Sequence, residues 1–156
     1  MSDNNSIDET SRAILRELQN DGRLSIQDLS VRVNLSPTPV ARRLRALEES
    51  GLITGYSVRL DEEKTGFPFS VFISVKLSRQ IDDALTTFED LIKSFPEVVD
   101  CWLMTGNRDY LLRVATAGLR EFESFLTGRL AKVPCVETIE TSIPLRRVKD
   151  GLERLP

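Results

Sequence analysis

Residues 25–51 read SIQDLSVRVNLSPTPVARRLRALEESG. Ser25 and Asp28 have the spacing of a capping box, with Asp in place of the usual Glu or Gln, so a helix is expected after Ser25. A second helix is expected from Pro37, because the first helical position tolerates the missing N–H of proline and Ser36 suits the position before it. Gly51 is a common stop signal for such a helix. The stretch therefore predicts two helices joined by a tight turn.

A further helix is predicted before this pair. Asp8 can cap its beginning, and Gly22 can end it. Its apolar stripe consists of Ile14, Leu15 and Leu18. Three helices of this size, with the last two joined by a short turn, form the pattern of a helix-turn-helix unit.

The helix that begins at Pro37 has two distinct sides. At about 100° per residue, Val40, Leu44 and Leu47 fall within a narrow arc that must face the core. The opposite side carries Thr38, Arg42, Arg45 and Glu49, and Arg43 lies on a flank. An arginine-rich helix taken alone is usually an ordinary solvated surface. As the third helix of this unit, it is better interpreted as a DNA-binding face, because guanidinium groups suit guanine edges and phosphates.

This interpretation assigns roles to single residues. Thr38, Arg42 and Arg45 are candidates for contact with base edges in the major groove. Candidates for phosphate contact are Ser36 and Pro37 at the helix N-terminus, together with Arg43, Arg23 and Arg59.

Residues 52–60 read LITGYSVRL, alternate in polarity and are rich in strand formers, so we expect a small wing or ribbon there. Residues 61–66, DEEKTG, are polar and end in Gly. The expected organisation is a lead-in at residues 1–6, a winged helix-turn-helix at 7–60, a linker at 61–67 and a second domain at 68–156.

The second domain has a different pattern of apolar residues. Alternation predicts strands at residues 69–77, 98–105, 110–116 and 136–143, and helical spacing predicts helices at 81–94 and 119–131. The order β-α-β-β-α-β is the ferredoxin-like arrangement, so the fold class is α+β.

A ferredoxin-like sheet has both helices on one face and leaves the other face open. The residues expected on the open face are Ser70, Phe72, Ser74, Lys76, Thr138, Glu140 and Ser142, with Arg113 as a further candidate. Such a face is either solvated or covered by a second copy in a homodimer, and we favour the dimer.

Composition narrows the classes of function. The chain of 156 residues has a net charge of −3, no histidine and two cysteines far apart, which leaves little from which to build a metal site or a histidine-based catalytic triad. No apolar run approaches the roughly 20 residues of a membrane span, and the N-terminus lacks the features of a secretory signal. We therefore expect a cytoplasmic protein that is not an enzyme and needs no cofactor.

The sequence resembles the Lrp/AsnC family, also called leucine-responsive or feast/famine regulators. The resemblance spans residues 7 to about 149 and rests on three signatures in order. These are IDETSRAIL at 7–15 with DGR at 21–23; LSPTPV at 35–40 with RLRALE at 43–48 and GLITGY at 51–56; and TGNRDYLL at 105–112. Each signature is moderately specific, whereas their order and spacing together are strongly specific.

The resemblance implies dimers that assemble into tetramers or octamers, and a C-terminal domain of the RAM type that binds a small effector, usually an amino acid. It places that effector at the loop between the second and third sheet strands, which comprises Met104, Thr105, Gly106, Asn107, Arg108, Asp109 and Tyr110. Gly106 would let the backbone approach the effector closely, and Asp109 would pair with its ammonium group. Arg108 departs from the aromatic residue of many relatives, which would either alter the choice of effector or remove effector binding altogether. From the residues alone, the same loop is simply a hairpin turn.

The function that these observations favour is a sequence-specific DNA-binding transcriptional regulator of amino-acid metabolism or transport genes, modulated by an amino acid. Its DNA target would contain two half-sites about one or two helical turns apart. The alternative is an architectural DNA-binding protein that acts without an effector.

Overall fold

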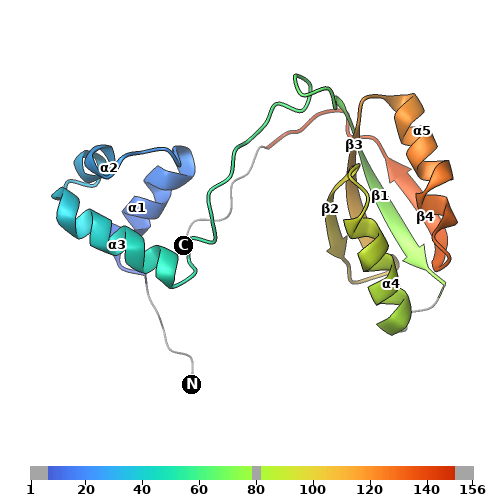
Figure 1. The fold of residues 1–156 in the computed structure, drawn as a ribbon, viewed down its shortest axis with the longest axis horizontal. Helices are drawn as coiled ribbons and strands as arrows, with labels where there is room; N and C mark the ends of the chain where they lie inside the picture. The colour runs from blue at the N-terminus through green and yellow to red at the C-terminus, as the bar shows by residue number, and fades with distance from the viewer. Residues whose placement is uncertain (1–6, 79–81, 150–156) are drawn as a thin grey trace. The chain divides into compact units, whose positions relative to one another are not determined.

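The computed structural model describes residues 7–78 and 82–149 (Figure 1). It divides them into two compact units: the first comprises residues 7–59 together with Lys149, and the second spans Leu60–Val148. The expected lead-in at residues 1–6 lies outside the described residues.

The first unit consists of three helices, as predicted: α1 (Glu9–Asn20), α2 (Ile26–Arg32) and α3 (Pro37–Glu49). Its core is a small cluster of buried side chains to which each helix contributes, formed by Ile14, Leu29, Val40 and Leu47. Asn34, in the turn between α2 and α3, has a positive φ of 54°, a conformation that asparagine tolerates better than most residues.

Side chains before the first two helices cap them as expected. The Asp8 carboxylate accepts a hydrogen bond from the Ser11 amide at 2.8 Å, and the Ser25 hydroxyl accepts one from the Asp28 amide at 3.1 Å. The Ser25 hydroxyl also donates to the Asp28 carboxylate at 2.6 Å, so the shorter Asp still pairs with the serine. Ser36 occupies the corresponding position before α3, but its side chain makes no capping hydrogen bond.

The expected wing or ribbon contains no strand in this structure, since residues 52–60 have no strand conformation. The segment is attached to α3 instead: the Ile53 amide donates to the Leu47 carbonyl at 3.1 Å, and the Tyr56 hydroxyl donates to Glu48 at 2.9 Å. Beyond that point Val58 is 82% exposed. A ribbon needs a second strand to pair its backbone groups, and the described part of this chain places none beside this segment.

The second unit has the predicted β-α-β-β-α-β order. Its elements are β1 (Phe69–Leu77), α4 (Asp82–Lys93), β2 (Val98–Leu103), β3 (Tyr110–Thr116), α5 (Leu119–Gly128), a 3₁₀ turn at Leu130–Lys132 and β4 (Val136–Ser142). The four strands form one antiparallel sheet in the order β2-β3-β1-β4. The ferredoxin-like prediction is confirmed. β2 is two residues shorter than expected, and the Met104 amide after it bonds the Asp109 carbonyl at 2.8 Å across the hairpin.

The sheet buries one face beneath both helices. Val71, Ile73 and Val75 of β1 are fully buried, and they pack in one cluster with Phe88 of α4 and Phe122 of α5. Figure 1 shows α4 and α5 lying along this sheet.

The opposite face follows from the strand register. One row across the sheet is Asp100, Arg113, Phe72 and Ser142, and the next is Trp102, Leu111, Ser74 and Glu140. Arg113 therefore does share the open face with Phe72. Its guanidinium binds Asp100 at 3.0 Å and Glu62 at 2.7 Å.

The segment expected as a linker belongs to the second unit. Residues 61–66 form a closed turn in which the Thr65 amide bonds the Asp61 carbonyl at 2.9 Å and the Phe67 amide bonds the Glu62 carbonyl at 2.8 Å. The ion pair between Glu62 and Arg113 holds this turn against the sheet. Among the described residues, no helix is both long and apolar enough to cross a membrane.

Candidate nucleic-acid interface and ligand site

The outer side of α3 carries the three residues expected to contact bases. Thr38, Arg42 and Arg45 are exposed, while Val40 and Leu47 on the inner side are 0% and 5% exposed. Within the described residues, the guanidinium groups of Arg42 and Arg45 have no hydrogen bond or ion pair. Both groups are therefore free to bind an external acceptor.

Arg43 lies half-buried on the flank of the same helix. Its guanidinium pairs with the Asp8 carboxylate and lies 3.5 Å from the Ser11 hydroxyl. The hydrogen bond from the Ser11 amide, and then the bond from Arg43, hold the pKa of Asp8 below its usual value. Arg43 thus ties α3 to the beginning of α1 through Nη1, the atom that makes both contacts, while its phosphate contact stays a prediction.

The N-terminus of α3 is a poorer anion site than its position suggests. A helix leaves its first four N–H groups without intrahelical partners, but here two of those four positions are Pro37 and Pro39. The donors that remain nearest the end are the Thr38 amide and the exposed Ser36, whose hydroxyl is not used in capping.

The two remaining phosphate candidates lie outside the helices. Arg23 is exposed between α1 and α2, where its backbone amide bonds the Asp21 carboxylate at 3.0 Å. Arg59 is exposed at the last residue before the second unit.

The loop expected to bind an effector joins β2 to β3. Met104, Thr105, Gly106 and Asn107 are all exposed. Gly106 has a φ of +113°, which strongly favours glycine, and a Cβ built there would meet no atom within 4 Å. The backbone of this loop is open to an approaching molecule.

Asp109 lies buried at the base of this loop. It is only 5% exposed, and its carboxylate accepts a hydrogen bond from the Leu77 amide at 2.7 Å at the end of β1. Its own amide bonds the Val75 carbonyl at 2.9 Å. The carboxylate closes the end of the sheet, and its pairing with a ligand ammonium stays a prediction from the family resemblance.

Arg108 reaches from the loop to β4. Its Nε donates to Glu140 at 3.2 Å, and its Nη2 binds the second oxygen of the same carboxylate. The Arg108 guanidinium therefore holds the loop against the open face of the sheet.

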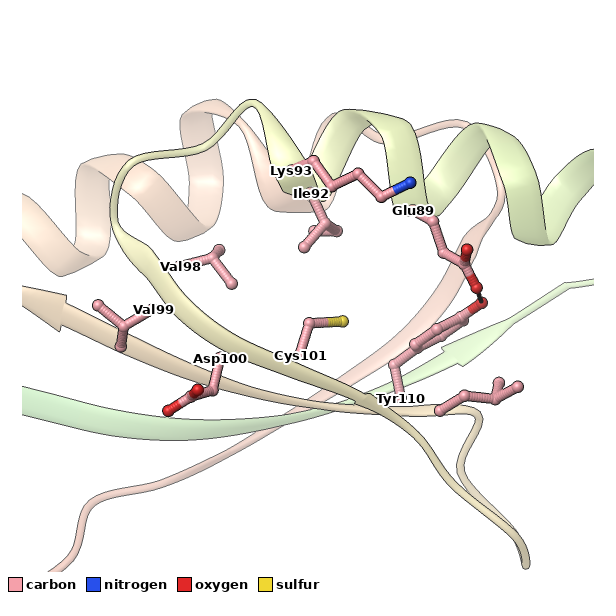
Figure 2. Close-up of a pocket in the computed structure, with 9 residues that line it drawn as sticks. Glu89, Ile92, Lys93, Val98, Val99, Asp100, Cys101 and Tyr110 are labelled. Atoms are coloured by element: carbon pink, nitrogen blue, oxygen red, sulfur yellow. Dashed lines mark hydrogen bonds between the residues drawn. The ribbon is translucent and has the colours of Figure 1, made fainter. Parts of the chain in front are cut away.

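A groove lies between β2 and α4, on the face of the sheet that the helices cover (Figure 2). Its volume is about 390 Å³. Of the residues expected at the effector site, Tyr110 alone lines it, and its hydroxyl donates to Glu89 at 2.8 Å. Burial, followed by the bond to Glu89, raises the pKa of Tyr110. Sequence reasoning missed Glu89, Lys93 and Cys101, because only the packing of α4 over β2 brings them together.

Comparison with family models gives two matches. The first is described as a winged helix-turn-helix DNA-binding domain and covers residues 7–54. The second is described as the Lrp/AsnC ligand binding domain and covers residues 70–153.

Similar proteins cover nearly the whole chain. The Bkd operon transcriptional regulator of Pseudomonas aeruginosa is 45% identical, over 91% of this chain and 93% of its own length. The leucine-responsive regulatory protein of Escherichia coli K12 is 35% identical, over 93% of this chain and 88% of its own. The proline dehydrogenase transcriptional activator of Rhodobacter capsulatus is also 35% identical, over 91% and 92% respectively.

Two similar solved structures contain an amino acid. A transcriptional regulator of Neisseria meningitidis in complex with L-methionine has a TM-score of 0.89 and 34% identity, covering 93% of this chain and 94% of that one. A feast or famine regulatory protein of M. tuberculosis, also complexed with L-methionine, has a TM-score of 0.82 and 31% identity, covering 97% and 100%.

Proposed function

This chain belongs to the Lrp/AsnC family of DNA-binding transcriptional regulators, and from that premise we propose that it controls genes of amino-acid metabolism or transport in response to a small amino acid. The names of its relatives support the class of gene, since they include a Bkd operon regulator and a proline dehydrogenase activator. The two L-methionine complexes support the class of effector.

The observation that carries the DNA-binding part is the pair of free guanidinium groups on α3. Arg42 and Arg45, with Thr38 beside them, read base edges when α3 enters the major groove. Ser36 and the Thr38 amide contact a phosphate at the N-terminus of α3. Pro37 fixes the backbone there without donating a hydrogen bond. Arg23 and Arg59 bind phosphates on either side.

Arg43 has a positioning role in this proposal. Its bond to Asp8 orients α3 on α1, which sets the direction of Arg42 and Arg45.

One unit makes few contacts with DNA, so useful affinity requires two units bound together. We propose a homodimer in which the open sheet faces pack on each other, because this face carries the aromatic side chains of Phe72 and Trp102. Dimers assemble further into tetramers or octamers, and the operator contains two related half-sites. A second copy could also supply the strand that residues 52–60 lack.

The effector contacts the loop Met104–Tyr110. The backbone around Gly106 binds the amino-acid carboxylate, and the bond between Arg108 and Glu140 holds the loop in place. Asp109 supports the loop from beneath.

The decisive experiment measures the affinity for DNA upstream of the chain's own coding region by fluorescence anisotropy. The Arg42→Ala/Arg45→Ala variant removes the two reading groups. The Arg120→Ala/Lys132→Ala variant removes the same charge from exposed positions of the second unit. Since a good base contact contributes about 1–3 kcal/mol, we expect the first variant to bind about tenfold or more weakly and the second to bind almost normally. Equal binding by all three proteins would refute the assignment of α3.

Adding each L-amino acid in turn tests the effector part of the proposal. We expect one of them to change the affinity or the length of the DNase footprint. If the protein binds its operator and no amino acid alters the footprint, it is an effector-independent architectural protein instead.

A further inference from the structure

The groove between α4 and β2 owes its shape to the edge of the sheet. β2 is an edge strand, and its pairing with β3 is interrupted by a register shift between Val98 and Asp100. The groove therefore opens along an edge strand whose outer backbone groups pair with no other described strand. Its volume of about 390 Å³ lies within the range of small-molecule sites, about 300–1,000 Å³.

Opposite charges stand on one rim of this groove. Glu89 and Lys93 lie one helical turn apart on α4, and Figure 2 shows both head groups above the strand. The Tyr110 hydroxyl fixes the Glu89 carboxylate with a hydrogen bond of 2.8 Å to one oxygen. The second carboxylate oxygen of Glu89 is left for another donor.

Lys93 can bind a ligand carboxylate with little loss of stability. Its ammonium pairs with Asp90 at 3.1 Å, and the side chains of Lys93 and Asp90 are 71% and 66% exposed. Exposed ion pairs of this kind contribute little to stability, so Lys93 can exchange Asp90 for a ligand carboxylate.

The groove-lining side chains between Glu89 and Lys93 are apolar, and the carboxylate of Asp100, which also lines the groove, pairs with Arg113 at 3.0 Å. Ile92 is 3% exposed and lies beside Val98, and the Cys101 thiol points into the same space (Figure 2). Burial, and then the nearby Glu89 carboxylate, raise the pKa of Cys101 to about 11. The thiol is therefore protonated at neutral pH and acts as a small apolar group.

We propose that this groove is a second amino-acid site, distinct from the loop at Gly106, which binds an α-amino acid with an apolar side chain. The ligand ammonium binds Glu89, the ligand carboxylate binds Lys93, and the side chain lies on Ile92 and Val98. The inference takes its class of ligand from the proposed function, while its location rests on the groove alone.

Cys101 reports directly on occupancy. The test measures the rate of iodoacetamide alkylation of Cys101 in the full-length protein at mildly alkaline pH, with L-leucine or L-methionine added. Peptide mass spectrometry separates Cys101 from Cys135, which serves as the internal reference. We expect either amino acid at saturation to slow alkylation of Cys101 about fivefold or more and to leave Cys135 unchanged.

Three variants test whether the protection of Cys101 from alkylation depends on Glu89 and Lys93. Lys93→Gln and Glu89→Gln should abolish it, because each removes one charged partner, and the amide oxygen introduced by Glu89→Gln can still accept the Tyr110 hydrogen bond. Lys132→Gln removes an exposed lysine from the 3₁₀ turn and should keep the protection. Thermal unfolding of each variant verifies that it folds.

The outcomes distinguish a failure of the proposed groove site from a failure of the proposed regulatory function. If amino acids alter DNA binding but leave Cys101 alkylation unchanged, the groove is not a ligand site and the regulator remains. Protection that survives in both groove variants also overturns the proposal. Protection that is lost in both variants supports it, even if DNA binding does not respond to amino acids.

Discussion

The Asp109 carboxylate makes a testable contribution to stability through its bond to the Leu77 amide, at 2.7 Å and with the residue 5% exposed. Asp109→Ala leaves that amide buried without this acceptor, which should lower the free energy of unfolding by about 1–3 kcal/mol. Asp109→Asn keeps an acceptor oxygen and should lose less. Urea denaturation measures both changes. An alanine variant that unfolds at the wild-type midpoint would show that the bond does not stabilise the fold.

Asp109 also shows which property of a single residue cannot be predicted from the sequence, namely its contact partner. Its place in a hairpin was readable from the neighbouring Gly106 and Asn107. Its burial was not, because the group that it binds lies on β1, 32 positions earlier in the chain. Arg43 is a parallel case: its face on α3 was predictable, whereas its partner Asp8 lies 35 positions away.

The pair of Asp8 and Arg43 predicts a dependence of stability on pH. Because the pKa of Asp8 is lowered in the folded state, its contribution is fully present above the unfolded pKa of about 3.9 and is lost as the pH falls through the folded pKa. Asp8→Asn keeps a capping side chain but removes the charge. We expect this variant to be less stable than the wild type at pH 7, with the difference shrinking below about pH 4. Urea denaturation across this range would contradict the prediction if the difference stayed constant.

At the scale of elements, the caps of α2 and α3 provide a matched pair. The Ser25 hydroxyl bonds the Asp28 amide at 3.1 Å, whereas Ser36 makes no capping bond with its side chain. Ser25→Ala should therefore lower the free energy of unfolding by about 1 kcal/mol, and Ser36→Ala should change it little. If Ser36 contacts phosphate as proposed, its alanine variant should weaken DNA binding instead. Equal destabilisation by both substitutions would mean that the difference in capping has no energetic consequence.

The elements themselves were largely predictable, because each has a strong local signal. Alternation over residues 69–77 and 110–116 coincides with β1 and β3. The helix expected to reach residue 131 ends at Gly128 and continues as a 3₁₀ turn. Residues 52–60 have the same alternation as a strand, but pairing decides whether a strand forms, and periodicity carries no information about a partner.

At the scale of the whole molecule, the net charge of −3 does not indicate the basic surface proposed to bind DNA. Acidic residues outnumber basic ones over the chain, yet the exposed side of α3 presents Arg42 and Arg45 without acidic partners among the described residues. The groove at α4 could not be predicted in the same way, since its shape depends on a bulge in β2 and on the packing of a helix.

The open sheet face provides the last prediction, which concerns assembly. Trp102 lies on this face in the row of Leu111 and is 44% exposed, whereas Leu119 begins α5 and is 62% exposed. Trp102→Lys places a charge in the proposed dimer interface, and Leu119→Lys makes a similar change away from that face. We expect sedimentation to detect dissociation toward monomers only for Trp102→Lys, because an unpaired charge in an apolar interface is costly.

The same variant separates assembly from DNA recognition. Loss of bivalent binding should weaken operator affinity about 10²–10⁴-fold. The slope of log affinity against log salt should also fall by about half, since one unit neutralises half as many phosphates. Leu119→Lys should retain both the wild-type affinity and the wild-type slope. A Trp102→Lys protein that remained dimeric with full affinity would place the interface elsewhere and leave the open face solvated, while a monomer with full affinity would mean that a single α3 suffices for binding.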